Sequence, residues 1–518
     1  MGALSWPRNL DMKDYLNPNG TQKIINSTGT DNPYWTIRNK PYSSKVNRLI
    51  VQGNLDYNPF SFLNFTYRLG TDYYTENFKG IRLRGTLEPC VNKGAINQSV
   101  STNQITTSTA ILTGKKTIGS DFNFSLSVGN NIEVSALQST TSTAINFLDP
   151  TFASINNSKP SDRTVSDGLL RRRIFSWFGD FNVDWKGIAY INGKARNDWT
   201  STLPRKDNSF FYPSISTAVI ITDLLKELGA KTDDRVFSYG KIRAAYSNVG
   251  KDADIYKLLT PLSTLTNDFT INPRGFIINS NGAFGNPLLV PEFTRSYEVG
   301  AEARFIKNRL GIDVTYYFSK SDNQILDLRT PPSSGSFLAT LNGGAIENKG
   351  VEVILNARPI VGNNFKWSID LNFAHNTSIV KALPAKIDRI ELSDAWAASN
   401  VAQGAAFLGG SLFGINGNVW KRNAQGQLLL NNSGYPQVAV ALANIGDRNP
   451  DFTMGITNTF NYKDFMFSFM VDIRSGGMVF NATENALVRS GLSLKTLDRG
   501  TKVFDGIIES TGLQNTIA

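Results

Sequence analysis

Residues 365–373 of this chain, FKWSIDLNF, alternate strictly between apolar and polar side chains. The apolar set is Phe365, Trp367, Ile369, Leu371 and Phe373, and the polar set is Lys366, Ser368, Asp370 and Asn372. A helix would scatter these residues around its circumference, whereas a β-strand places successive side chains on opposite faces. The stretch is therefore predicted to be a strand with two different environments. Its apolar face could meet either a protein core or lipid hydrocarbon.

The same alternation recurs along the chain. It is clear in DFNFSLSVG at 121–129, GDFNVDW at 179–185, YEVGAEARF at 297–305, IDVTYYF at 312–318, VEVILNA at 351–357 and DFMFSFMVDIR at 464–474. One face of each segment is rich in aromatic or branched apolar residues, and the other carries charged or amide side chains. Many of these segments have close to the roughly 9–11 residues that a tilted strand needs to cross a bilayer.

The connections between these segments fall into two classes. Tight turns are predicted at Asn58-Pro59, Lys186-Gly187, Lys307-Asn308, 362–364 and Lys463-Asp464. Long polar stretches, predicted to be loops, lie at 70–120, 136–168, 249–291, 319–347 and 376–450. Loops of this length are uncommon in compact soluble domains, whereas short turns at one rim and long loops at the other are typical of outer-membrane barrels.

The chain is therefore predicted to be all-β, forming part of a large antiparallel transmembrane β-barrel of about sixteen strands, with long extracellular loops and short periplasmic turns. Its hydrophobic content is only 41%, and no run approaches the roughly 18 apolar residues of a spanning helix. The opening residues, MGALSWPRNLDMKD, contain no visible signal peptide. Two alternatives stay open: a passive porin or export channel, and a carbohydrate-binding β-sandwich at the cell surface.

Residue counts argue against catalysis and against bound cofactors. Cys90 and His375 are the only cysteine and histidine, which excludes an internal disulfide, a CxxC pair, a His-based triad and a multi-His zinc site. No GxGxxG, Walker A or GxSxG motif occurs. The net charge of +10 is dispersed rather than gathered in blocks, so nucleic acid is not expected as a partner. We predict that the chain is not an enzyme, binds no cofactor, and has no catalytic or metal-binding residue.

A few residues are weak candidates for other roles. The cluster Arg171–Arg173 is expected to be solvated or to face the lumen, with contact to a lipid phosphate as the alternative. Asp252 and Asp254 have a calcium-loop-like spacing but lack the central Gly and terminal Glu, so a solvated loop is expected. Trp199, Trp396 and Trp420 are expected in an aromatic girdle or a loop core rather than stacked on sugars. The pair Asp233 and Asp234 has no identifiable acid–base environment. Substrate-binding residues cannot be assigned.

Several phrases together resemble the SusC/RagA-type TonB-dependent outer-membrane transporters. The resemblance is carried by the barrel segment at 286–326, NPLLVPEFTRSYEVGAEARFIKNRLGIDVTYYFSKSDNQIL, and by ENKGVEVILNA at 347–357, FFYPSISTAV at 210–219 and GKIRAAYSNVG at 240–250. Two later phrases, at 449–469 and 486–512, are also similar to the end of the family's barrel. The ordered set runs from about Val46 to the last residues.

The resemblance implies a place in the outer membrane of a Gram-negative bacterium, crossed many times by strands. It also implies TonB-dependent import of oligosaccharides or oligopeptides with a SusD-like surface lipoprotein, and it allows a dimer of transporter–lipoprotein pairs. Family members have a signal peptide, a TonB box and a plug before a barrel of about 22 strands. Residues 1–518 are expected to be barrel alone, without those parts and without the final strands. Contact with TonB would then pass through a plug that this segment lacks.

Overall fold

The architecture is known from a computed structural model. It describes residues 6–7, 9–24, 31–87, 92–230, 233, 235–260, 262–264, 276–278, 283–334, 336, 338–384, 386–391 and 402–517.

One antiparallel sheet of fourteen strands dominates the structure, and nearly every strand pairs with the next long strand along the chain. Its strands, in spatial order, are β1 (Tyr42–Phe60), β2 (Leu63–Arg82), β3 (Ala95–Ile118), β4 (Phe122–Ile145), β5 (Arg163–Trp185), β6 (Ala189–Thr200), β7 (Ser209–Ile220), β8 (Phe237–Lys251), β12 (Glu292–Phe305), β13 (Leu310–Asp322), β16 (Ala345–Val361), β17 (Phe365–Ala382), β23 (Pro450–Tyr462) and β24 (Phe465–Gly476). The sheet has two strands fewer than the sequence suggested, because several strand-like segments form smaller sheets in the loops.

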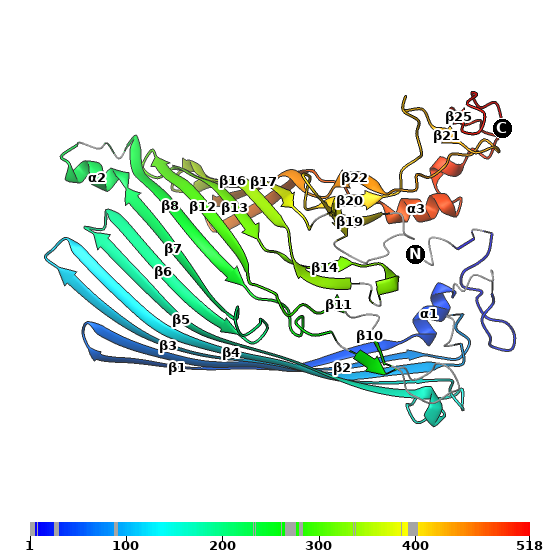
Figure 1. Cartoon of the computed structure of the whole chain (residues 1–518). Coiled ribbons are helices and arrows are strands. Elements are labelled where there is room, and N and C mark those ends of the chain that lie inside the picture. The colour runs from blue at the N-terminus through cyan, green and yellow to red at the C-terminus, as the bar shows by residue number, and fades with distance from the viewer. Residues whose placement is uncertain are drawn as a thin grey trace.

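The sheet curves into part of a barrel wall (Figure 1). The sheet order ends at β1 on one side and at β24 on the other, so these two strands do not pair within the described residues. The strands belong to a single continuous sheet rather than to two stacked ones. This arrangement confirms the predicted partial barrel and contradicts the β-sandwich alternative.

The two rims of the sheet differ as the sequence predicted. Short turns, together with the α2 helix (Ile221–Glu227), lie at the left in Figure 1, and the long loops and both chain ends lie at the right. Four of the predicted turns connect consecutive strands as expected. At Asn58-Pro59 the prediction is wrong, because β1 continues to Phe60 through an irregular pairing and turns at Ser61-Phe62.

Two stretches predicted as loops contain long parts of strands. Residues 70–120 contain most of β2 and all of β3, and residues 136–168 contain the end of β4 and the beginning of β5. β3 and β4 have 24 residues each, well beyond the roughly 11 that hydrocarbon requires. Hydroxyl pairs across the strands support this extension, such as Thr71 with Thr106 at 3.2 Å and Thr75 with Thr102 at 3.3 Å. Polar strands therefore continue past the membrane.

The two faces of the sheet can be assigned from its inner core. Phe210 packs with buried Leu203, Ala253 and Leu289 where the loops fold into the curve of the sheet. Phe210 pairs with Asp198, and Asp198 pairs with Ser176, so these side chains share the inward face. On β5 the inward set also includes Arg172, Phe178, Asp180, Asn182 and Asp184, and the outward set includes Phe175, Trp177, Phe181, Val183 and Trp185.

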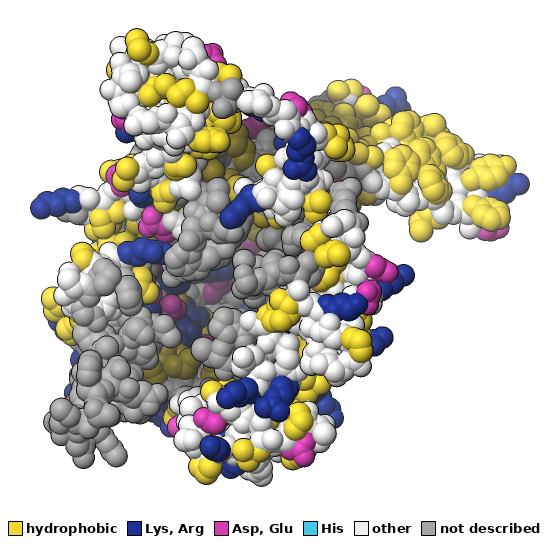
Figure 2. Space-filling model, turned by 90° about the vertical axis from the view of Figure 1, so that its right-hand side faces the viewer, with side chains coloured by type: hydrophobic (Ala, Val, Ile, Leu, Met, Phe, Trp, Pro, Cys, Tyr) yellow, Lys and Arg dark blue, Asp and Glu magenta, His cyan; other side chains and the backbone are white. Residues whose placement is uncertain are grey.

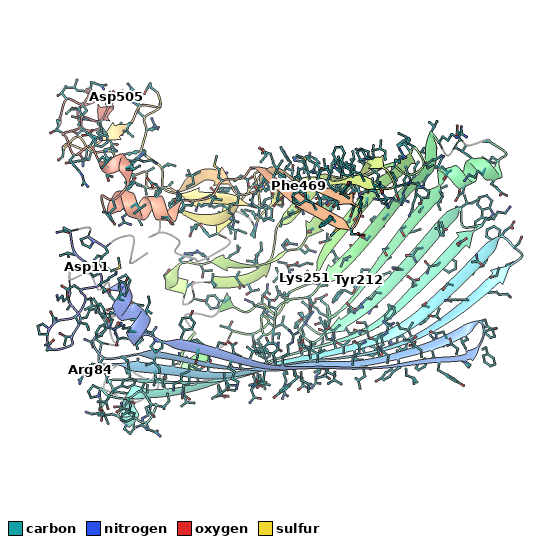
Figure 3. All side chains as sticks on the ribbon, turned by 180° about the vertical axis from the view of Figure 1, so that it is seen from behind. Asp11, Arg84, Tyr212, Lys251, Phe469 and Asp505 are labelled. Carbon is teal, nitrogen blue, oxygen red and sulfur yellow. The ribbon has the colours of Figure 1, made fainter. Side chains whose placement is uncertain are left out.

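Apolar side chains form a continuous outward surface. They include Phe175, Trp177 and Phe181 on β5, Tyr297 and Val299 on β12, and Phe467 and Phe469 on β24, all of them exposed. Figure 2 shows hydrophobic side chains gathered on one projecting part of the molecule, and Figure 3 labels Phe469 at the margin of the sheet away from β1. A large exposed apolar surface of this kind is what lipid hydrocarbon requires.

The loops carry the remaining elements. Four small sheets pair β9 (Leu262–Thr264) with β10 (Phe276–Ile278); β11 (Ala283–Phe284), β15 (Leu338–Asn342) and β14 (Ile325–Arg329); β18 (Arg389–Glu391), β19 (Ala402–Phe407), β20 (Gly414–Gly417) and β22 (Ala443–Asp447); and β21 (Leu429–Leu430) with β25 (Ile507–Ile508). Helices α1 (Pro33–Asn39) and α3 (Ala482–Arg489) flank the sheet in sequence. Residues 486–512, expected in the late barrel, instead contribute the end of α3 and β25 and add no strand to the large sheet.

Candidate functional site

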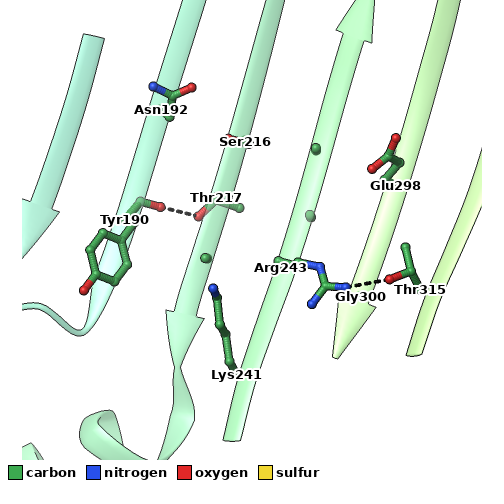
Figure 4. A pocket seen from close by; sticks show the side chains of 12 residues that line it. Tyr190, Asn192, Ser216, Thr217, Lys241, Arg243, Glu298, Gly300 and Thr315 are labelled. Atoms are coloured by element: carbon green, nitrogen blue, oxygen red, sulfur yellow. Dashed lines mark hydrogen bonds between the residues drawn. The ribbon is translucent and has the colours of Figure 1, made fainter. Parts of the chain in front are cut away.

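The inward face of the sheet carries a polar hollow over β6, β7, β8, β12 and β13 (Figure 4). Its volume is about 220 Å³, and its side chains include Tyr190, Asn192, Ser216, Lys241, Arg243, Glu298 and Thr315. The strand pairing places each of these residues on the inward face of its strand. The wall that faces away from lipid therefore offers hydroxyl, amide, cationic and anionic groups together.

One ion pair spans three strands of this wall. Arg243 on β8 donates to both carboxylate oxygens of Asp313 on β13, at 2.9 and 2.7 Å, and to Thr315 Oγ1 at 2.6 Å. β12 lies between these two strands, and its residue at the crossing is Gly300. A Cβ at Gly300 would lie 2.7 Å from Arg243 Nε. Glycine at this position therefore lets the guanidinium cross the intervening strand.

Glycine and a large inward side chain face each other at two further positions. Gly129 pairs with Phe178, and a Cβ there would lie 2.3 Å from the ring. Gly350 pairs with Tyr317, and a Cβ there would lie 2.5 Å from the ring and from its hydroxyl. Large side chains thus lie flat over the neighbouring strand instead of projecting into the interior, which leaves the interior wide.

We expect Gly300→Ala to destabilise the protein by about 1–2 kcal/mol, because the new methyl group displaces Arg243 from Asp313 and Thr315. Urea unfolding of the purified protein measures the change. In an Arg243→Ala background the same substitution should cost less than about 0.5 kcal/mol. An equal cost in both backgrounds would show that the glycine serves the backbone and not the ion pair.

A second hollow lies nearer the turn rim and is strongly charged. It measures about 540 Å³ and is lined by Glu302, Arg304, Asn308, Asp313, Asn356, Arg358, Ser368 and Asp370, among others. Arg304 Nε donates to Glu302 at 2.8 Å, and its guanidinium lies 5.0 Å from the centre of the Tyr239 ring. Both signs of charge occur, so this part of the wall can form hydrogen bonds with a polar molecule without favouring strong net charge of either sign.

The loop rim of the inward face contains a buried carboxylate. Asp252, directly after β8, accepts two hydrogen bonds from Arg172 on β5, at 3.0 and 2.6 Å. It also accepts bonds from Thr200 at 2.5 Å and Thr202 at 2.8 Å. The Asp252 side chain is 7% exposed. The prediction of a solvated loop is therefore wrong for Asp252, whereas Asp254 is exposed as expected.

This network sets the charge state of Asp252. Burial alone would raise its pKa, but the hydrogen bonds from Arg172, Thr200 and Thr202, with the nearby positive charge, outweigh burial and lower the pKa below its ordinary value. Arg172 is the inward member of the arginine cluster, as predicted for a lumen-facing residue. Its neighbours Arg171 and Arg173 have the opposite parity and face outward.

The remaining candidates lie apart from one another. Trp199 is on the outward face, with its ring centre 5.6 Å from that of Phe175, which fits an aromatic girdle. Trp420 is exposed in a loop. The ring of His375 on β17 bonds to the carbonyl of Asp451. Asp233 accepts a bond from the backbone N–H of Arg235 beside the turn rim. Cys90, Asp234 and Trp396 lie outside the described residues.

No group of three or more His, Cys, Asp or Glu side chains that could hold a metal occurs in the described part of the chain. Among the same residues, no helix is both long and apolar enough to span a membrane.

Comparison with known proteins assigns this architecture. Residues 2–478 match the family described as "TonB dependent receptor-like, beta-barrel". TonB-dependent receptor P26 of Formosa agariphila is 28% identical over 363 residues, which cover 64% of this chain and 34% of that protein. TonB-dependent receptor SusC of Bacteroides thetaiotaomicron is 25% identical over 316 residues, covering 58% of this chain and 31% of SusC.

Solved structures have the same fold. The RagAB peptide importer in its "closed-closed" state superposes with a TM-score of 0.73 at 16% identity, covering 90% of this chain and 52% of that one. The RagAB peptide transporter gives 0.71 at 17% identity, covering 87% and 50%. The chain thus spans about a third of the curated relatives' length and about half of the RagAB chain. Because the match extends over residues 2–478 of 518, the chain belongs to the TonB-dependent receptor-like β-barrel family of outer-membrane proteins, whose members are receptors and not enzymes.

Proposed function

We propose that the protein forms barrel wall in a SusC/RagA-type importer of the Gram-negative outer membrane, which takes up oligosaccharides or oligopeptides. The observation that carries the proposal is the polar inner wall, where charged pairs and two hollows face the interior opposite a lipid-facing apolar surface. The resemblance to SusC/RagA-type transporters implies these two cargo classes, and the RagAB peptide importer of similar fold supports the oligopeptide.

Two partners belong to this proposal. A SusD-like surface lipoprotein delivers the cargo at the loop rim, and TonB supplies energy through a plug outside residues 1–518. The long loops, with their own small sheets and cores, give the lipoprotein a structured rim to bind. The barrel itself supplies a closed path once its full set of strands is present, because hydrocarbon does not tolerate unpaired strand edges.

Uptake measurements test the proposal. Cells producing the complete receptor should accumulate fluorescent oligosaccharide or oligopeptide, and collapse of the proton gradient should abolish that uptake. Deleting the gene of the SusD-like surface lipoprotein should also reduce the uptake strongly. Uptake that persists without the proton gradient would instead identify a passive channel. Uptake of neither cargo class under energised conditions would reject the proposed cargo.

A further inference from the structure

Two arginines of β5 lie on the lipid side of the wall. Arg171 and Arg173 share the outward parity of Phe175 and Trp177, and both are exposed. Arg172, between them, faces inward and pairs with Asp252. Neither Arg171 nor Arg173 has a carboxylate partner within the residues that the structure describes. Two unpaired guanidinium groups on a lipid-facing surface need a counter-charge.

The position of Arg171 and Arg173 relative to the bilayer follows from their place on β5. From Trp185 at the turn rim to Phe175, the outward residues of β5 are apolar or glycine. These eleven residues, counting both ends, correspond to a band about 25 Å tall once the strand is tilted. Arg173 is the next outward residue and Arg171 follows it, on the loop side. The pair therefore lies at the boundary between hydrocarbon and headgroups of the outer leaflet.

The surroundings leave the guanidinium groups open to that boundary. The neighbouring β4 places only Val134 opposite Arg173 and Ala136 opposite Arg171. On the other side β6 ends at Thr200, opposite Ile174, and the following loop bonds to the backbone of Arg173 through Ser201. On the turn side of the two arginines, aromatic rings form the margin of the apolar band. The ring centre of Phe175 lies 6.4 Å from that of Trp177 and 5.6 Å from that of Trp199.

We propose that Arg171 and Arg173 bind a phosphate group of a phosphorylated glycolipid in the outer leaflet, such as lipid A. A guanidinium presents its donors in a planar fork that matches phosphate oxygens. The aromatic margin below accommodates the start of the acyl chains. The glycolipid is the occupant rather than free phosphate because the pair adjoins a surface that only a lipid can cover. The inference depends on the orientation of the barrel and not on its cargo.

The experiment titrates the purified, delipidated receptor with lipid A in detergent micelles and measures the apparent dissociation constant. Arg171→Gln/Arg173→Gln should weaken binding at least tenfold. Lys116→Gln is the matched control, because Lys116 is also outward and exposed but lies near the turn rim, opposite Phe124. It should change the affinity by less than twofold. Heat-modifiable gel migration verifies that each variant is folded.

A second arm needs no variant. Dephosphorylated lipid A should bind the wild-type receptor as weakly as intact lipid A binds the double variant, and millimolar inorganic phosphate should not compete. The proposal is overturned if the double variant keeps wild-type affinity or if removing the lipid phosphates changes nothing. Competition by inorganic phosphate would also overturn it, because the site would then take a free anion and not a lipid.

Discussion

Val299→Arg should destabilise the receptor in lipid vesicles by about 2–4 kcal/mol, the cost of an arginine that faces lipid near the bilayer midplane. Val299 is exposed on the outward face of β12, six residues from its end at Phe305. A strand crosses hydrocarbon in about eleven residues, so this position is close to the middle of the apolar band. The guanidinium cannot reach either headgroup layer without local bilayer distortion.

Ser296→Arg is the matched control on the same strand. Ser296 has the inward parity and pairs with Ser247 and Ser319, so the new side chain enters the wet interior. Its expected effect is below about 1 kcal/mol, measured by urea unfolding in the same vesicles. If the two substitutions cost the same, the two faces of β12 do not meet different solvents.

Asp252→Asn should lower the free energy of local opening at the loop rim by about 2–3 kcal/mol. The substitution removes the charge that holds Arg172, Thr200 and Thr202 together. Among the ion pairs of the described residues, Arg172 would keep the weaker one with Glu133, at 3.7 Å. Hydrogen exchange of the amides at 200–203 and 252–254 measures the opening. Asp254→Asn, in the same loop but exposed, is the control and should change exchange by less than about 0.5 kcal/mol.

The same carboxylate gives the rim a pH dependence with a definite sign. The pKa of Asp252 is lower in the folded protein than its ordinary value of 3.8. Its stabilising contribution is therefore complete above that ordinary value and is lost as the pH falls through the lower, folded pKa. Acid should release the rim in the wild type and have little further effect in Asp252→Asn. Equal acid sensitivity in both would assign the effect to other groups.

The alternation of apolar and polar residues was sufficient to predict the wall. In β12, β13, β17 and β24 each side chain's face follows from period two alone, because a strand has no other way to place it. The turns at Lys186-Gly187 and Lys463-Asp464 were equally clear. The extent of the strands was not, because the threonine-rich part of β3 resembles a polar loop until its partners Thr71 and Thr75 are known.

The inner site depends on register, which the sequence does not state. Asp252 and Arg172 are 80 residues apart in the chain, and only the positions of β5 and β8 bring them together. Arg243, Gly300 and Thr315 are each unremarkable alone, and they align because β8, β12 and β13 pair at those residues. One signal in the sequence could have suggested the pair of Arg243 with Asp313. It is an arginine on the inward face of one strand and a glycine on the inward face of the next.

The central claim is that the wall separates lipid on its outward face from a polar interior on its inward face. The most direct test is to measure whether successive residues of β12 alternate in their exposure to lipid. Nitroxide labels can be placed singly at residues 297–299 and 301–303 in a Cys90→Ser background, which has no other cysteine; Gly300 is left unlabelled because a side chain there would meet Arg243. Labels at Tyr297, Val299, Ala301 and Ala303 should be relaxed mainly by oxygen, which concentrates in hydrocarbon. Labels at Glu298 and Glu302, which lie between them on the inward face, should be relaxed mainly by a water-soluble nickel complex. Oxygen and nickel accessibilities that do not alternate would contradict a wall between lipid and a polar interior.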